Sequence, residues 1–69
     1  MFLVDRVSPE AQALDEWREA ADLVRVRWAT FLEADAQTRQ WAFASYVAAL
    51  DAEDAAARAL SALSLPQAA

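Results

Sequence analysis

Apolar residues in the first half of the chain recur every three or four positions, which is the repeat of an amphipathic α-helix. The positions that keep this phase are Leu14, Trp17, Ala21, Val24, Trp28 and Phe31. A start signal precedes them, because the Ser8 hydroxyl can accept from free N–H groups of the first turn and Pro9 fits the first helical position. The pattern predicts a helix over residues 9–34, after an N-terminal arm of residues 1–7.

The phase of the apolar residues breaks after this helix. Continuing the first phase would place Asp35 and Thr38 on the apolar face, while several bulky residues would fall off it. These bulky residues are Trp41, Phe43, Tyr46, Val47 and Leu50. Asp35 or Thr38 can cap a second helix, and we favour Asp35. The second helix is predicted over residues 36–63, followed by a tail of residues 65–69, because Pro66 opposes its continuation.

Two helices of similar length joined by a short connection pack as an antiparallel hairpin. The predicted fold class is therefore all-α, with one helical domain over residues 1–69. A turn centred near residue 36 places Trp28 level with Phe43, Val24 with Val47, and Ala21 with Leu50. The alternative is one continuous helix, since no Gly or Pro interrupts the two patterns, but the phase break argues against it.

Large apolar side chains occur on more than one face of each predicted helix, which exceeds what a two-helix hairpin can cover. We expect a second copy to cover the excess, so that two hairpins form a four-helix bundle, a homodimer with a two-fold axis. The candidate interface residues are Phe2, Leu23, Val26, Trp41, Leu60 and Leu63. Trp41 is the best interface anchor, because it lies off the apolar seam of the hairpin. An alanine stripe at positions 48, 52, 55, 59 and 62 would let another helix approach closely.

Glu53 stands out because it lies in a mostly apolar stripe of the second helix. The stripe consists of Ala42, Tyr46, Ala49, Glu53, Ala56, Leu60 and Leu63. We expect a buried, paired carboxylate, with an arginine or the Tyr46 hydroxyl as its partner. A polar residue in such a stripe more often sets the register of two helices than performs chemistry. Asp51, Glu53 and Asp54 do not predict a metal site, because carboxylate sites in helical bundles also use His.

Composition argues against catalysis. The chain contains no His, Cys, Gly or Lys, which removes the usual general base, thiol and amine nucleophiles, soft metal ligands and glycine-rich phosphate loops. We therefore expect no enzymatic activity, no cofactor, no metal and no small-molecule substrate.

The net charge of the chain limits the classes of partner that it can bind. Eleven Asp and Glu residues against six Arg give a net charge of −5, which opposes binding to nucleic-acid phosphates and to anionic membranes. Most arginines have a carboxylate at helical spacing, and the expected pairs are Arg18 with Asp15 and Asp22, Arg25 with Asp22, Arg39 with Asp35, and Arg58 with Asp54. Uncharged stretches are too short to span a bilayer, and Asp5 interrupts the N-terminal apolar residues too early for a signal peptide, so we expect a cytoplasmic protein.

The sequence favours a small helical interaction protein that associates with itself or with another protein, as an adaptor, assembly subunit or regulator. The alternative is an acidic inhibitor that occupies the basic groove of a nucleic-acid-binding protein. Its acidic face would consist of Asp15, Glu16, Glu19 and Asp22. Ion pairing on this face argues against the alternative, since a mimic of nucleic acid should carry uncompensated charge.

Overall fold

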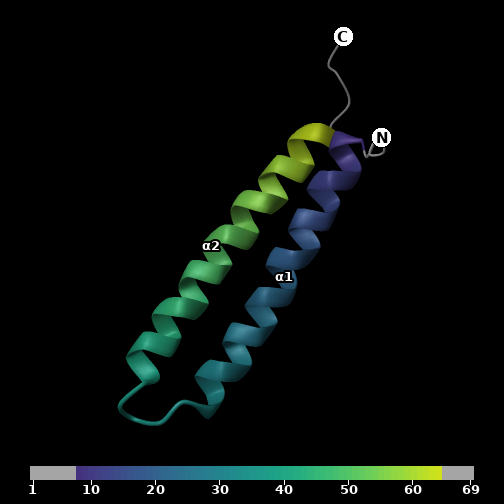
Figure 1. The fold of residues 1–69 in the computed structure, drawn as a ribbon. Helices are drawn as coiled ribbons and strands as arrows, with labels where there is room; N and C mark the ends of the chain where they lie inside the picture. Colours follow the sequence, from purple (N-terminus) through teal and green to yellow (C-terminus); the bar gives the residue numbers. More distant parts are fainter. Residues whose placement is uncertain (1–7, 65–69) are drawn as a thin grey trace, which may run out of the picture.

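Residues 8–64, which the computed structural model describes, form two α-helices joined by a short connection (Figure 1). α1 spans Pro9–Glu33 and α2 spans Arg39–Ser64. The helices run antiparallel and lie side by side along their length (Figure 1). The predicted all-α hairpin is confirmed, and the alternative of one continuous helix is wrong. The expected N-terminal arm and C-terminal tail lie outside the described residues.

α1 begins at the predicted start signal. Ser8 has an extended backbone, with φ −67° and ψ 157°, and its Oγ accepts a hydrogen bond from the Ala11 backbone N–H over 3.1 Å. The Ser8 carbonyl accepts from the Gln12 N–H over 3.0 Å. Pro9 at the first helical position has no N–H to satisfy, and Ser8 thus provides partners for the Ala11 and Gln12 N–H groups of the first turn.

α1 ends one residue earlier than predicted, at Glu33. Ala34 leaves the helix with φ −69° and ψ 142°, and its N–H donates to the Phe31 carbonyl over 3.1 Å. Because this exit keeps φ negative, it requires no glycine, which explains how a chain without glycine turns sharply here.

Asp35 organises the connection between the helices. Its Oδ1 accepts from the backbone N–H groups of Gln37 and Thr38 and from the Thr38 hydroxyl, each over 3.0 Å. This is the hydrogen-bonding pattern of a helix N-cap. The Thr38 N–H also reaches the Asp35 carbonyl over 3.3 Å, so that residues 36–38 form a tight turn. The regular helix therefore begins at Arg39, three residues after the predicted start, and it ends at Ser64, one residue after the predicted end.

The contact between the helices is built on small residues. Ala13, Ala42 and Ala49 are the buried residues of the described range, and no large side chain there is fully buried. The remaining seam residues of α1, namely Leu14, Trp17, Ala21, Val24 and Phe31, are half-buried, and Trp28 remains 42% exposed. In α2 the residues that face α1 are Ala42, Tyr46, Ala49, Glu53, Ala56 and Leu60. Alanines bring the backbones close together, but they supply little apolar area for a core.

Candidate protein-interaction surface

Trp17 and Glu53 form a polar contact inside the helix pair. The Trp17 Nε1–H donates to Glu53 Oε2 over 2.7 Å, and both side chains are half-buried. Glu53 is therefore paired, as its position in an apolar stripe predicted, but its partner is neither an arginine nor the Tyr46 hydroxyl. The indole reaches Glu53 because Trp17 belongs to the apolar seam of α1, and this seam faces α2. The contact helps to fix the register of the two helices.

Four aromatic rings form a closed cluster near the connection. Trp28 contacts Tyr46 with ring centroids 5.0 Å apart and Phe31 at 5.5 Å. Phe43 contacts Phe31 at 5.5 Å and Tyr46 at 6.4 Å. The rings are tilted against one another, an arrangement that favours contact between the edge of one ring and the face of the next.

The cluster differs from the expected pairing of Trp28 with Phe43. Side chains of a helix lean toward its N-terminus, and in antiparallel helices the two N-termini are at opposite ends. The Trp28 side chain therefore leans away from the connection, whereas the Tyr46 side chain leans toward it, so these two rings meet. Phe43 packs on Phe31, closer to the connection.

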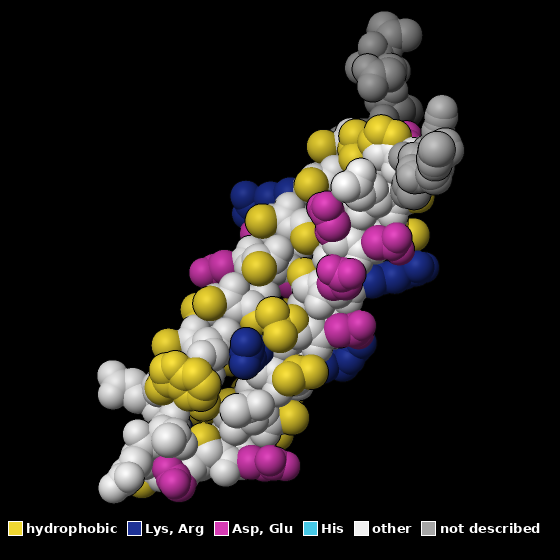
Figure 2. Space-filling view, viewed as in Figure 1, with side chains coloured by type: hydrophobic (Ala, Val, Ile, Leu, Met, Phe, Trp, Pro, Cys, Tyr) yellow, Lys and Arg dark blue, Asp and Glu magenta, His cyan; other side chains and the backbone are white. Residues whose placement is uncertain are grey.

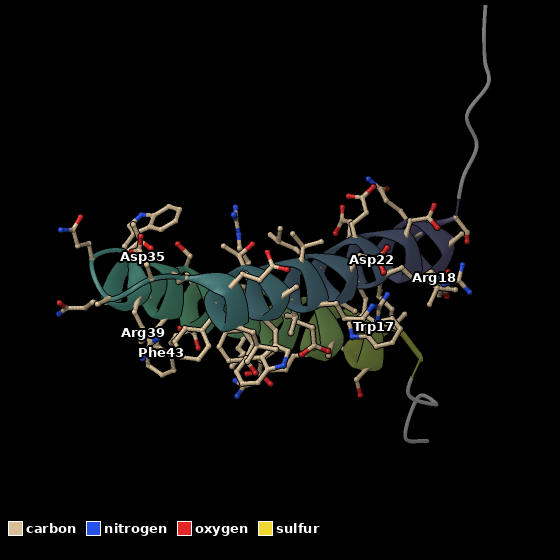
Figure 3. All side chains as sticks on the ribbon, turned by 90° about the horizontal axis from the view of Figure 1, so that it is seen from below. Trp17, Arg18, Asp22, Asp35, Arg39 and Phe43 are labelled. Carbon is tan, nitrogen blue, oxygen red and sulfur yellow. The ribbon has the colours of Figure 1, made fainter. Side chains whose placement is uncertain are left out.

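One side of the hairpin carries most of the exposed large apolar residues. We call this side the aromatic face and define it by Trp28 and Leu32 of α1 and Phe43, Val47 and Leu50 of α2. These side chains are between 37% and 63% exposed. Figure 3 shows Phe43 and Trp17 on the same side of the hairpin, toward the bottom of that view. The aromatic face thus borders the contact between the two helices and is exposed to solvent.

The sequence placed Phe43, Val47 and Leu50 level with seam residues of α1 but did not predict their exposure. In the structure Ala42 and Ala49 are the buried residues of α2, and they lie on the side that packs against α1. Each of these alanines precedes a bulky residue, Phe43 or Leu50, by one position, which is roughly 100° around a helix. The bulky residues therefore lie at the flank. The sequence signal for this exposure was that the bulky residues of the second apolar run stand next to Ala42 and Ala49 rather than in phase with them.

The opposite side of the hairpin is smoother. Figure 2 shows small hydrophobic side chains along α2 and acidic side chains along α1. We call this side the alanine face, after the exposed residues Ala48, Ala52, Ala55, Ala59 and Ala62. By helical spacing it also includes two predicted interface residues, Leu23 and Trp41, which are 39% and 62% exposed.

The other predicted interface residues are dispersed. Val26 is 55% exposed and lies on the outer side of α1, away from α2 by helical spacing. Leu60 is half-buried in the stripe of α2 that faces α1, and Phe2 lies outside the described residues. Leu63 is 44% exposed at the end of that same stripe. Leu23 and Trp41 therefore share one side of the hairpin, but the predicted interface residues do not form one patch.

Two of the expected ion pairs form within residues 8–64. Arg25 contacts Asp22, and Arg58 Nη2 lies 3.0 Å from Asp54 Oδ2. Within the same range Arg18 and Arg39 lie farther than an ion-pair distance from every carboxylate. Both observed pairs are exposed, so that water screens them and each contributes little to stability.

The fold perturbs the titration of Asp35. Hydrogen bonds from the Thr38 backbone N–H, the Thr38 hydroxyl and the Gln37 backbone N–H lower the pKa of Asp35 below its usual value, and the nearby Arg39 charge lowers it further. All these donors favour the ionised carboxylate. The perturbation is thus a consequence of helix capping at the connection.

Features typical of a small-molecule site are absent from residues 8–64. This range contains no pocket and no group of three or more carboxylates placed to hold a metal ion. Neither helix combines the length and the apolar character needed to cross a membrane. The exposed apolar faces are therefore the strongest candidate sites on this part of the chain.

Searches with family models, curated proteins and solved structures found no match to this chain.

Proposed function

We propose that this chain is a small interaction protein, a helical hairpin that binds protein and has no catalytic activity of its own. The observation that carries the proposal is the inversion of burial in residues 8–64. The buried residues are three alanines, whereas nine large apolar side chains are exposed. Stable domains normally contain at least two packed layers around a core, and two helices form a single layer.

The hairpin leaves a large apolar surface in contact with water. Full burial of a large apolar side chain contributes about 1.5–3 kcal/mol relative to exposure. The five side chains of the aromatic face are 37% to 63% exposed, so complete coverage would recover roughly half of that value for each, together about 4–7 kcal/mol, which is comparable with the whole stability of a marginal small domain. A partner that covers this face would therefore stabilise the hairpin while binding it.

The absence of catalytic activity is supported by the chemistry of the side chains. A chain without His, Cys or Lys has only hydroxyls, carboxylates and guanidinium groups for catalysis. The Asp35 carboxyl group, whose pKa is lowered, accepts three hydrogen bonds that cap a helix. This role explains its perturbation without a reaction.

The test is sedimentation equilibrium over a concentration series, with thermal unfolding followed by circular dichroism on the same samples. The proposal expects either an oligomer whose melting temperature rises with concentration, or a monomer that lacks a cooperative transition until a partner is added. A monomer that unfolds cooperatively at a concentration-independent temperature would contradict it, because such a hairpin would not need its apolar faces covered.

A second candidate function is the acidic inhibitor, and one observation favours it. The expected ion pairs of Arg18 with Asp15 and Asp22 do not form within residues 8–64, and Glu16 and Glu19 are exposed there without an ion pair, so this surface is less neutralised than the sequence suggested. Binding to a basic partner would then weaken steeply with salt, whereas apolar docking would show a flat dependence. Substitution of Glu16 and Glu19 by Gln would weaken binding to a basic partner and leave apolar docking intact.

A further inference from the structure

We infer that the occupant of the aromatic face is a second copy of this chain, related to the first by a two-fold axis parallel to the helices. The inference rests on the proposed function and specifies its partner. In this arrangement α1 of each copy packs on α2 of the other, and all neighbouring helices of the resulting four-helix bundle run antiparallel.

The size of the face suits a dimer. Helices of 25 and 26 residues are roughly 38 Å long, and two packed helices are about 20 Å wide, so one face measures about 750 Å². A standard interface buries about 800 Å² on each partner. One copy laid along the full face therefore gives an interface of ordinary size, without any contribution from the alanine face.

The rows of residues across the aromatic face combine apolar and charged positions. On α1, residues spaced by three and four give the row Leu14, Arg18, Ala21, Arg25, Trp28 and Leu32. On α2 the corresponding row is Phe43, Val47, Leu50, Asp54 and Ala57. The α1 edge of the face is therefore basic and the α2 edge carries an acidic residue, each embedded among apolar side chains.

The Trp17–Glu53 hydrogen bond indicates which charged residues of α1 and α2 lie at the same height, that is, at the same distance from the connection along the hairpin. Because Trp17 contacts Glu53, the next residues along each helix, Arg18 and Asp54, also lie at nearly the same height along the hairpin. By helical spacing they occupy opposite edges of the aromatic face. Figure 3 shows Arg18 beside Trp17, at the end of the hairpin opposite Phe43.

A two-fold axis that runs parallel to the helices along the middle of the aromatic face brings the α1 edge of one copy against the α2 edge of the other. It leaves the position of each residue along the helices unchanged. It therefore places Arg18 opposite Asp54 of the second copy, and the symmetry repeats the contact. Arg18 makes no ion pair within residues 8–64, and Asp54 uses Oδ2 for Arg58, which leaves Oδ1 for another donor. An axis perpendicular to the helices would instead stack α1 on α1 and bring the Arg18 and Arg25 rows together, which like-charge repulsion disfavours.

The experiment is a charge reversal in the full chain, read out by sedimentation equilibrium. We expect Arg18→Glu alone, or Asp54→Arg alone, to raise the dissociation constant of the dimer roughly tenfold, because each change turns two attractive contacts into two repulsive ones. An equimolar mixture of the two variants should form a heterodimer with the affinity of the original chain. The double variant Arg18→Glu/Asp54→Arg should also recover self-association.

Asp51→Arg is the matched control, because it makes the same charge change on the same helix but lies off the aromatic face. Recovery in the mixture, with no effect of the control, would support the inference, since a folding defect within one chain cannot be repaired by mixing. A dimer that tolerates both single reversals would overturn the inference and leave the proposed function standing. A monomer without a cooperative transition would also overturn only the inference, whereas a cooperatively folded monomer would overturn both.

Discussion

The indole N–H of Trp17 donates to a carboxylate oxygen of Glu53 over 2.7 Å, and within residues 8–64 it is the side-chain hydrogen bond that joins α1 to α2. Alanine contacts alone would allow one helix to slide along the other, because small side chains interlock weakly. A directional bond between half-buried groups is lost when the helices slide by one turn. The pair therefore helps to specify the register of the hairpin, together with the Trp28–Tyr46 and Phe31–Phe43 ring contacts near the connection.

Removing the indole N–H should destabilise the hairpin. We expect Trp17→Phe to lower the free energy of unfolding by about 1–2 kcal/mol, because the half-buried Glu53 carboxylate loses its donor. Glu53→Gln keeps an acceptor oxygen and should cost less than half of that. Urea unfolding of the three proteins at one fixed concentration measures the difference, and a wild-type midpoint for Trp17→Phe would show that the bond contributes nothing.

The alanine contact between the helices should not tolerate a larger side chain. Ala49 is 4% exposed and faces α1, so we expect Ala49→Leu to push the helices apart and to destabilise the protein by about 1–3 kcal/mol. Ala44→Leu is the control, because Ala44 is an exposed position on the same helix that lies away from α1. Equal unfolding midpoints for the two variants would contradict the helix orientation described above.

Asp35 should make stability depend on pH in the acid range. Its pKa is lowered in the folded protein, chiefly by the Thr38 backbone N–H, so ionised Asp35 stabilises the fold above the unfolded-state pKa of about 3.9. This stability is lost as pH falls through the lower folded-state pKa. Asp35→Asn keeps a capping side chain that does not titrate. The wild-type protein should therefore lose stability relative to Asp35→Asn below about pH 4, and parallel urea midpoints would refute the assignment.

Two neighbouring positions of α2 distinguish the aromatic face from the alanine face. Val47 belongs to the aromatic face and Ala48 to the alanine face, and both are exposed. We expect Val47→Arg to raise the dissociation constant of the dimer at least tenfold, because the new guanidinium would face Arg25 of the second copy, two turns along the same rows from the Arg18–Asp54 contact. Ala48→Arg should leave the constant unchanged. The reverse result in sedimentation would assign the interface to the alanine face and to Trp41, the anchor predicted from sequence.

Much of the fold follows from local patterns. The spacing of Leu14, Trp17 and Phe31 specifies the inner side of α1, and Ser8 and Asp35 supply side-chain oxygens at the two helix starts. These features are readable because helix periodicity and capping depend on residues a few positions apart. The start of α2 at Arg39 was harder to predict from sequence, since it depends on whether residues 36–38 form a tight turn or the first turn of an α-helix.

The sequence by itself determined two amphipathic helices, an antiparallel hairpin, an excess of apolar surface and a polar residue in the stripe of α2 that faces α1. Only the tertiary structure decided that Trp17 is the partner of Glu53, that Ala42 and Ala49 occupy the interior, and that Phe43 remains exposed at the flank. The physical reason is that periodicity specifies which side of a helix is apolar, whereas the height and rotation of one helix against another depend on side-chain direction and on contacts distant in sequence.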